Sequence, residues 1–498
     1  MRSILCVDPS RIPPRRDDPG GSTVRATLGA SPPQTETRRL RDQLGGLRDL
    51  LDRVAQSSPA RLAVLVFVGV AGLFTLLLWL PWSSHAGRST TFVDAAFTAA
   101  SAVTVTGLTV VPTADHWSFT GQLIILVAVQ IGGLGTLTMT SLLALAIGRK
   151  LGLRSKLVTQ NAMNVGRLGE VGSLLRTVAA TSIVIEGSLA LILTIGFLVA
   201  GEPMHTALWH GIFYSVSAFN NGGFTPHSDG LVPYFTDSVH VWLILFPISM
   251  GVLIGSLGFP VILVLRQVGW LRFSRWNLNT KVTVVTTLGL MLLGWVLWAG
   301  LEWTNPASIG DESPGQKIFN GFFASVMMRS GGFNIVEMAD LQPVTLLLTD
   351  ALMFAGGAPA STGGGIKVTT FAVVVLAILA EARGDQAVLA FHRTIPDGVL
   401  RIAISVIAMS ATIVLTAVGI LLVLTGEPLE RVLFEVVSAY ATCGLSVGLS
   451  GEMGPAGKAV LIVVMFIGRI GTTTVATALA LRSSQRLYQY PEERLIIG

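Results

Sequence analysis

Long apolar stretches separated by short polar segments recur along the chain from about residue 60. About twenty helical residues cross the hydrocarbon core of a bilayer, and eight stretches reach or exceed that length. They form four pairs, whose first members lie near residues 61–80, 177–200, 282–301 and 402–424, and whose second members lie near 121–147, 239–265, 344–379 and 458–481. The pattern predicts an all-α integral membrane protein with eight transmembrane helices.

A shorter apolar stretch lies between the two members of each pair and ends in a glycine followed by Phe or Leu. The four copies are FTAASAVTVTGLT (97–109), FYSVSAFNNGGFT (213–225), FFASVMMRSGGFN (322–334) and FEVVSAYATCGLS (434–446). Their glycines, Gly107, Gly223, Gly332 and Gly444, are separated by 116, 109 and 112 residues. This spacing predicts four diverged copies of one helix, pore loop and helix unit.

The length of these short stretches indicates how they sit in a membrane. About ten helical residues rise roughly 15 Å, so each stretch can enter a bilayer but cannot cross it. Glycine then lets the backbone leave the helix at positive φ and turn successive carbonyl oxygens the same way. Non-helical backbone at membrane depth must line a cavity, and rings of carbonyl oxygens replace the hydration shell of a cation. The repeats therefore predict four loops around a central cation pore.

The second helices contain a further aligned pattern. IGGLG (131–135), IGSLG (254–258) and IGRIG (467–471) correspond to AGGAPASTGGGIK (355–367) in the third unit. Five glycines and a proline in this segment are incompatible with a regular helix, so we predict an intramembrane gating loop at 355–367, with a structural kink as the alternative. Arg469, a charge in mid-helix, would hold the carbonyls of this loop or make a packing hydrogen bond between helices. The predicted gating residues are Gly356, Gly357, Gly363, Gly364, Gly365, Lys367 and Arg469.

Composition and charge set the orientation and limit the function. With 51% hydrophobic and 13% charged residues, the chain fits a membrane protein and no nucleic-acid-binding class. Most Lys and Arg residues lie in the N-terminal tail, in loops 149–176, 266–281 and 383–401, and at the C-terminal end, which predicts cytoplasmic termini. The opposite loops are rich in acids, which would attract cations or merely keep short loops soluble.

The chain divides into five predicted segments. Residues 1–55 form a cytoplasmic tail, disordered to about residue 38, with a membrane-surface helix or an ordinary solvated helix near 40–54. Residues 56–150, 151–270, 271–382 and 383–498 are the four pore repeats. Membrane lipids are the expected surroundings of all four.

No residue pattern indicates an enzyme. GLSVG at 444–448 has the spacing of a hydrolase nucleophile motif but lies in a predicted membrane loop, and metal-hydrolase and nucleotide-binding motifs are absent. Cys6 and Cys443 cannot form a disulfide framework. Glu186 and Asp350 are single acids in spanning segments, where helix-to-helix hydrogen bonds are favoured over a proton relay.

The loops VTGL, NGGF, SGGF and TCGL, together with IGGLG, AGGAPASTGGGIK and FIGRIG, resemble the TrkH/KtrB superfamily of potassium-uptake membrane subunits, with KtrB the closer type. The resemblance covers about residues 60–485. It implies potassium uptake across the bacterial inner membrane, with sodium as a coupling ion in symport or as an activating ion. The alternative function is a passive or weakly selective monovalent cation channel. It also implies a homodimer controlled by a cytosolic nucleotide-binding ring of the KtrA/TrkA kind, and no cofactor within this chain.

The resemblance further implies which backbone oxygens form the selectivity filter and hold potassium. Three consecutive residues from each loop are carried over by position: Val105, Thr106 and Gly107; Asn221, Gly222 and Gly223; Ser330, Gly331 and Gly332; Thr442, Cys443 and Gly444. Arg329, three residues before its glycine, is expected to brace the filter from behind, since a cation facing the pore would repel potassium.

Overall fold

The computed structural model describes residues 59–150, 170–235 and 237–471. All of the described residues belong to the unit formed by residues 58–498. The N-terminal tail and the expected surface helix at 40–54 lie outside the described residues. So does the end of the last expected spanning helix, from residue 472.

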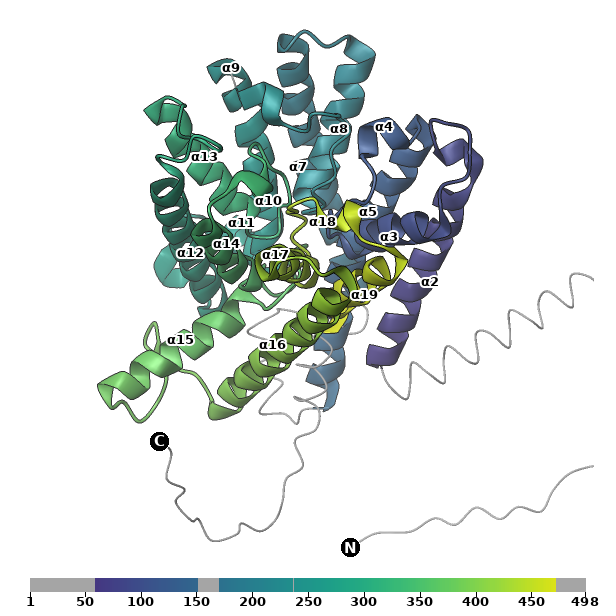
Figure 1. Ribbon diagram of the computed structural model, residues 1–498. Helices are drawn as coiled ribbons and strands as arrows, with labels where there is room; N and C mark the ends of the chain where they lie inside the picture. Colours follow the sequence, from purple (N-terminus) through teal and green to yellow (C-terminus); the bar gives the residue numbers. More distant parts are fainter. Residues whose placement is uncertain (1–58, 151–169, 236, 472–498) are drawn as a thin grey trace, which may run out of the picture. The chain divides into compact units, whose positions relative to one another are not determined.

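The described chain is almost entirely helical (Figure 1). Its first half contains α2 (Pro59–Trp79), η1 (Pro81–Ser83), α3 (Phe92–Thr104), α4 (Thr113–His116), α5 (Phe119–Lys150), α7 (Glu170–Val199), α8 (Met204–Phe219), η2 (Val232–Phe235), α9 (Ser238–His240), η3 (Val241–Leu245), α10 (Phe246–Leu257) and α11 (Phe259–Val268). The second half contains η4 (Phe273–Arg275), α12 (Leu278–Glu302), α13 (Pro314–Met327), η5 (Met338–Asp340), α14 (Pro343–Phe354), α15 (Val368–Arg383), α16 (Asp397–Thr425), α17 (Leu429–Ala441), α18 (Leu449–Glu452), α19 (Pro455–Phe466) and η6 (Ile467–Gly471). A two-stranded hairpin, β1 (Leu389–Ala390) and β2 (Arg393–Thr394), connects α15 to α16.

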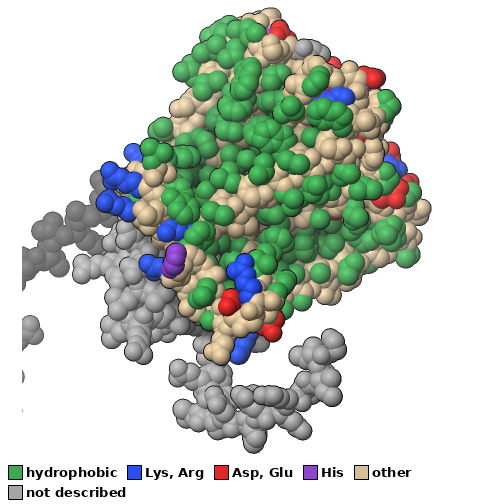
Figure 2. Space-filling model, turned by 90° about the vertical axis from the view of Figure 1, so that its left-hand side faces the viewer, with side chains coloured by type: hydrophobic (Ala, Val, Ile, Leu, Met, Phe, Trp, Pro, Cys, Tyr) green, Lys and Arg blue, Asp and Glu red, His purple; other side chains and the backbone are tan. Residues whose placement is uncertain are grey.

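Four helical segments in the described residues are long and apolar enough to cross a membrane. They are 176–199, 238–257, 278–302 and 397–425. Hydrophobic side chains cover most of the face shown in Figure 2, and charged side chains lie toward its margins. An apolar outer surface of this kind suits hydrocarbon surroundings. The full set of eight crossings stays a prediction.

The short helices α3, α8, α13 and α17 correspond to the four predicted re-entrant stretches. Polar residues fix where two of them begin. The Thr91 side chain accepts a hydrogen bond from the Asp94 backbone at the start of α3, and Ser313 with Gln316 forms a capping box at the start of α13. Each short helix is largely buried against its neighbours.

The second helices differ in how far they stay regular. The prediction of one continuous helix over 239–265 is wrong. This stretch contains a π-helical turn (η3) and is interrupted at Gly258, which has φ +81° and precedes Phe259 and Pro260. The expected break between α14 and α15 is present. IGRIG forms a π-helical turn (η6), whereas α5 continues through IGGLG. Three of the four second helices are therefore deformed near the aligned glycines.

Segments from the two ends of the described chain pack together. Helix α19 contacts α3. The Lys458 ammonium of α19 forms an ion pair at 2.7 Å with the carboxylate of Asp94 in α3. This contact connects the last predicted repeat directly to the first.

Candidate functional site

Each of the four short helices ends in the same backbone turn. The residue two before the glycine has positive φ in every copy: Val105 (55°), Asn221 (61°), Ser330 (76°) and Thr442 (48°). The glycines repeat this geometry: Gly107 (90°), Gly223 (67°), Gly332 (76°) and Gly444 (94°). Non-glycine residues with positive φ are uncommon, and four at equivalent positions indicate a conformation that the surrounding packing imposes.

The four glycines form a closed set of neighbours in chain order. A Cβ added to Gly107 would lie 3.2 Å from the Gly223 Cα, and one on Gly223 would lie 3.1 Å from the Gly332 Cα. A Cβ on Gly332 would lie 3.3 Å from the Gly444 Cα, and one on Gly444 would lie 3.2 Å from the Gly107 Cα. Segments more than 100 residues apart in sequence thus meet as a ring of glycines.

Carbonyl oxygens lie between adjacent members of this ring. A Cβ on Gly107 would lie 2.5 Å from the Gly222 oxygen, and a Cβ on Gly332 would lie 2.5 Å from the Cys443 oxygen. The residues that carry these oxygens immediately precede the filter glycines. This close approach leaves little room for a side chain, most severely at Gly107, Gly332 and Gly444, and together with the positive φ it explains why glycine occupies all four positions. The twelve predicted filter residues all belong to these four turns, and ion binding by their oxygens stays a prediction.

The segment 355–367 separates α14 from α15 and is buried almost throughout. Its own backbone closes part of it, with the Gly357 N–H donating to the Gly364 oxygen at 3.3 Å. Two backbone carbonyls of the neighbouring helix α10 accept further hydrogen bonds. The Ala358 N–H donates to the Ser256 oxygen at 3.0 Å, and the Thr362 N–H donates to the Gly255 oxygen at 3.4 Å. The polar groups freed by the helix break are therefore satisfied by protein, as burial requires.

The same segment contacts the filter turns directly. The Thr362 hydroxyl lies within hydrogen-bond distance of two acceptors, the Asn221 side-chain oxygen at 3.1 Å and the Phe219 carbonyl at 3.3 Å, and shares its one proton between them. The Gly364 N–H donates to the Ser330 hydroxyl at 3.4 Å, and this hydroxyl donates to the Thr442 carbonyl at 2.7 Å. The predicted gating loop and three of the four filter turns thus share one hydrogen-bond network.

Three cationic side chains donate to carbonyls of this segment: Arg329 and Arg469 are buried, and Lys367 is half-buried. Arg469 donates to the Thr362 oxygen and, at 3.5 Å, to the Gly132 oxygen of α5. The Lys367 ammonium donates to the Gly363 oxygen at 2.8 Å. Arg329 donates to the Gly356 oxygen at 2.9 Å, so it braces the segment 355–367, and its expected bracing of the filter stays a prediction. Arginine offers several donors to carbonyls that a broken helix leaves without helical partners.

The single acids of the spanning segments have different surroundings. Glu186 accepts hydrogen bonds at 3.1 Å from Gln130 of α5 and Asn220 at the end of α8, so it joins helices as expected. Asp350 differs from expectation, because its Oδ1 atom is buried with no hydrogen-bond partner in the described part of the chain.

The acid-rich loops are less negative than their sequence suggests. Glu427 and Glu452 both form ion pairs with Arg431, at 2.6 and 3.0 Å. Glu202 is paired with His210 and His227. The positive charge of Arg431 therefore offsets part of the expected attraction for cations.

Sequence reasoning missed how the aligned glycines of the second helices are used. Gly132, Gly255 and Gly468 each pack so closely on a carbonyl that a Cβ would overlap it. Those carbonyls belong to Val103, Phe219 and Tyr440, each four residues before a filter glycine. The repeated Ile-Gly pattern was the available signal, and its structural reason is close support of the filter turns.

We predict that Thr362→Val raises ion flux by roughly two- to tenfold if the segment 355–367 closes the pore. Valine preserves the shape but removes the hydroxyl proton shared between Asn221 and Phe219, a hydrogen bond worth about 0.5–1.5 kcal/mol, so the loop would be less firmly held. Tracer uptake into proteoliposomes measures the change. Thr349→Val is the matched control, because the buried Thr349 hydroxyl donates to the Thr345 carbonyl of its own helix. Equal flux in both variants would contradict a closing role for Thr362.

Comparison with known proteins identifies the class. The family of cation transport proteins named TrkH matches residues 63–490, and the chain belongs to this family. The chain is 36% identical over 443 residues to the Ktr system potassium uptake protein D of Bacillus subtilis, covering 89% of this chain and 97% of that protein. It is 35% identical over 450 residues to the Ktr system potassium uptake protein B of Vibrio alginolyticus, covering 89% and 96%.

The fold agrees with that assignment. The crystal structure of the potassium transporter TrkH from Vibrio parahaemolyticus superimposes with a TM-score of 0.65 at 20% identity, covering 85% of this chain and 84% of that one. Family membership and the apolar helices identify a membrane protein. The interpretation as a transport protein and not an enzyme is confirmed, because the family consists of cation transporters.

Proposed function

We propose that this protein mediates potassium uptake across the bacterial cell membrane through a filter formed by four loops. The observation that carries the proposal is the ring of four glycines, with carbonyl oxygens between adjacent members. Oxygen ligands from four chain segments can replace the hydration shell of a monovalent cation without any charged side chain in the ring. The potassium uptake proteins D and B that resemble the chain support potassium as the substrate.

The segment 355–367 is proposed as the gate. Its hydrogen bonds to filter turns and to Arg469 support a position directly beside the ion path. In the proposed arrangement eight spanning helices surround the filter in four repeats, and both termini are cytoplasmic. Sodium as coupling or activating ion, a homodimer and a cytosolic nucleotide-binding subunit rest on the family resemblance alone.

Growth of cells stripped of their own potassium uptake systems tests this proposal. Expression of the chain is expected to restore growth at low potassium, and the dependence on sodium and on a co-expressed cytosolic subunit would show which regulators it needs. Uptake that saturates with external potassium would distinguish a transporter from a passive channel. Failure under every condition, with the protein present in the membrane, would contradict the potassium assignment.

A further inference from the structure

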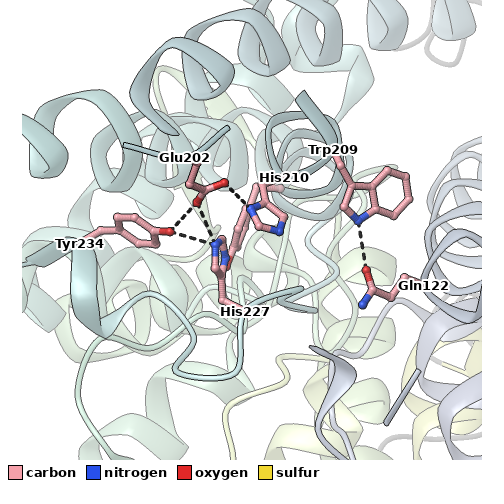
Figure 3. A network of polar contacts seen from close by, with 7 residues as sticks. Gln122, Glu202, Trp209, His210, His227 and Tyr234 are labelled. Atoms are coloured by element: carbon pink, nitrogen blue, oxygen red, sulfur yellow. Dashed lines mark hydrogen bonds and ion pairs between the residues drawn. The ribbon is translucent and has the colours of Figure 1, made fainter. Parts of the chain in front are cut away.

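A cluster of metal-ligand side chains lies in the second repeat, apart from the filter and the gating segment (Figure 3). Glu202 follows α7, His210 lies in α8, and His227 lies four residues beyond Gly223. Their ligand atoms all lie within 4.8 Å of one another, and no other such group of three occurs among the described residues. The side chains are 12–19% exposed, so the cluster is held by protein and remains open to solvent.

The three side chains converge on one point. The Glu202 carboxylate approaches His210 Nδ1 at 2.7 Å through one oxygen and His227 Nε2 at 3.1 Å through the other. The Tyr234 hydroxyl donates to Glu202 at 2.7 Å and lies 2.8 Å from His227 Nε2. Hydrogen bonds at these distances require protons between the ligand atoms, and metal binding would displace those protons.

The rings are oriented by a second layer of contacts. His227 Nδ1 shares a hydrogen bond of 2.9 Å with the hydroxyl of the fully buried Tyr214, which leaves Nε2 directed at Glu202. The centroids of the His210 and His227 rings lie 4.0 Å apart, and the Phe197 ring packs against both. Metal-binding histidines commonly have the other ring nitrogen held in this way, which fixes tautomer and orientation.

Burial and hydrogen bonding act in opposite directions on two groups of the cluster. Burial lowers the pKa of His227, although the hydrogen bond with Glu202 acts in the other direction. Burial alone would raise the pKa of Glu202, but hydrogen bonds with His210, His227 and Tyr234 together hold that pKa well below its ordinary value.

We propose that Glu202, His210 and His227 form a binding site for a divalent transition metal ion, with Zn²⁺ as the preferred type. Two imidazoles and one carboxylate are a zinc ligand set that leaves a fourth position for water. Zinc bonds of about 2.0–2.2 Å place tetrahedral ligand atoms roughly 3.3–3.4 Å apart. The two carboxylate-to-nitrogen distances of 2.7 and 3.1 Å would therefore widen by a few tenths of an ångström, and all three ligand atoms already lie within 4.8 Å of one another. Imidazole nitrogen disfavours Ca²⁺, Mg²⁺ and potassium, which prefer oxygen ligands, so this site is separate from the proposed ion path.

The three ligands come from three different elements of the second repeat. A bound ion would crosslink the end of α7, the second turn of α8 and the segment that leaves the filter after Gly223. Because the crosslink would exist only in the folded protein, metal binding should raise its melting temperature.

Metal titration of the purified full-length protein, freed of any affinity tag and stripped with a chelator, tests the proposal. Calorimetry with Zn²⁺ is expected to show one ion bound per chain, and Co²⁺ is expected to give the visible absorption of a tetrahedral site. His210→Ala and His227→Gln should each weaken Zn²⁺ affinity at least about tenfold and remove the melting-temperature increase.

His205→Ala is the matched control, because His205 is an exposed histidine at the start of the same helix α8 and lies outside the cluster. It should bind Zn²⁺ like the wild type. His227→Gln retains a polar side chain of similar reach and guards against misfolding, which elution as a single monodisperse species would check. Absence of Zn²⁺ and Co²⁺ binding to the wild type, or equal affinity in folded His210→Ala, His227→Gln and wild type, would overturn the proposal.

Discussion

Gly332→Ser is expected to reduce the preference for potassium over sodium at least about tenfold. Gly332 has φ +76°, and an added Cβ would lie 2.5 Å from the Cys443 oxygen and 3.0 Å from the Gly223 Cα. A side chain therefore strains its own backbone by roughly 1–3 kcal/mol and displaces an oxygen of the adjacent turn. Competition between potassium and sodium for uptake, measured in cells without other uptake systems, gives the selectivity.

The crowding around each glycine predicts how strongly its substitution lowers the preference for potassium over sodium. Gly223→Ser should lower selectivity less, because the nearest backbone atoms to an added Cβ lie 3.1–3.3 Å away. Gly448→Ser is the matched control: this residue follows the fourth filter turn with φ +85°, and an added Cβ would meet nothing within 4 Å. It should keep wild-type selectivity despite similar backbone strain. Unchanged selectivity in both Gly223→Ser and Gly332→Ser would show that the four-loop filter is wrong.

Arg469→Ala is expected to raise potassium flux roughly ten- to a hundredfold and to make it less dependent on a cytosolic subunit. The guanidinium joins Thr362 of the segment 355–367 to Gly132 of α5, and thereby fixes the proposed closed position. Loss of a charge-assisted hydrogen bond costs about 1.5–3 kcal/mol, which is sufficient to shift a closed-to-open equilibrium by that factor. Initial rates of tracer uptake into proteoliposomes measure the change.

Two further variants make this result interpretable. Deletion of Gly363–Gly365 should also raise flux, because it shortens the segment that closes the path. Arg431→Ala is the matched control, because it removes an arginine of the same predicted repeat. The partners of Arg431, Glu427 and Glu452, lie outside the gating network, so this variant should leave flux unchanged. Loss of flux in both Arg469→Ala and the deletion, at normal membrane levels, would instead identify the segment as a structural support.

The filter turns could be located from sequence because their physics is local. A helix too short to span a membrane, followed by a glycine at a fixed distance, already specifies a re-entrant turn. The break at 355–367 was equally visible, since five glycines and a proline cannot continue a helix. The Gly258 break was less evident, because IGSLG resembles IGGLG, through which α5 continues; only the following Phe-Pro distinguishes the two.

Contacts between distant segments could not be predicted in the same way. The bond from Thr362 to Asn221 and the bond from Arg329 to Gly356 depend on how the repeats pack, which no spacing in the sequence specifies. The metal-ligand cluster is a similar case. Glu202, His210 and His227 come from a helix end, a helix and a loop, so they match no helical or finger-type ligand spacing.

The most direct test of the account is the position of a bound ion. Crystals of the protein grown with thallium, a heavy monovalent substitute for potassium, would show its anomalous signal. A potassium-selective filter predicts a peak on the axis of the ring, between the backbone oxygens of Thr106, Gly222, Gly331 and Cys443, that falls as potassium is added in competition. No peak within the ring at saturating thallium, or a peak that potassium does not displace, would contradict a potassium-selective filter.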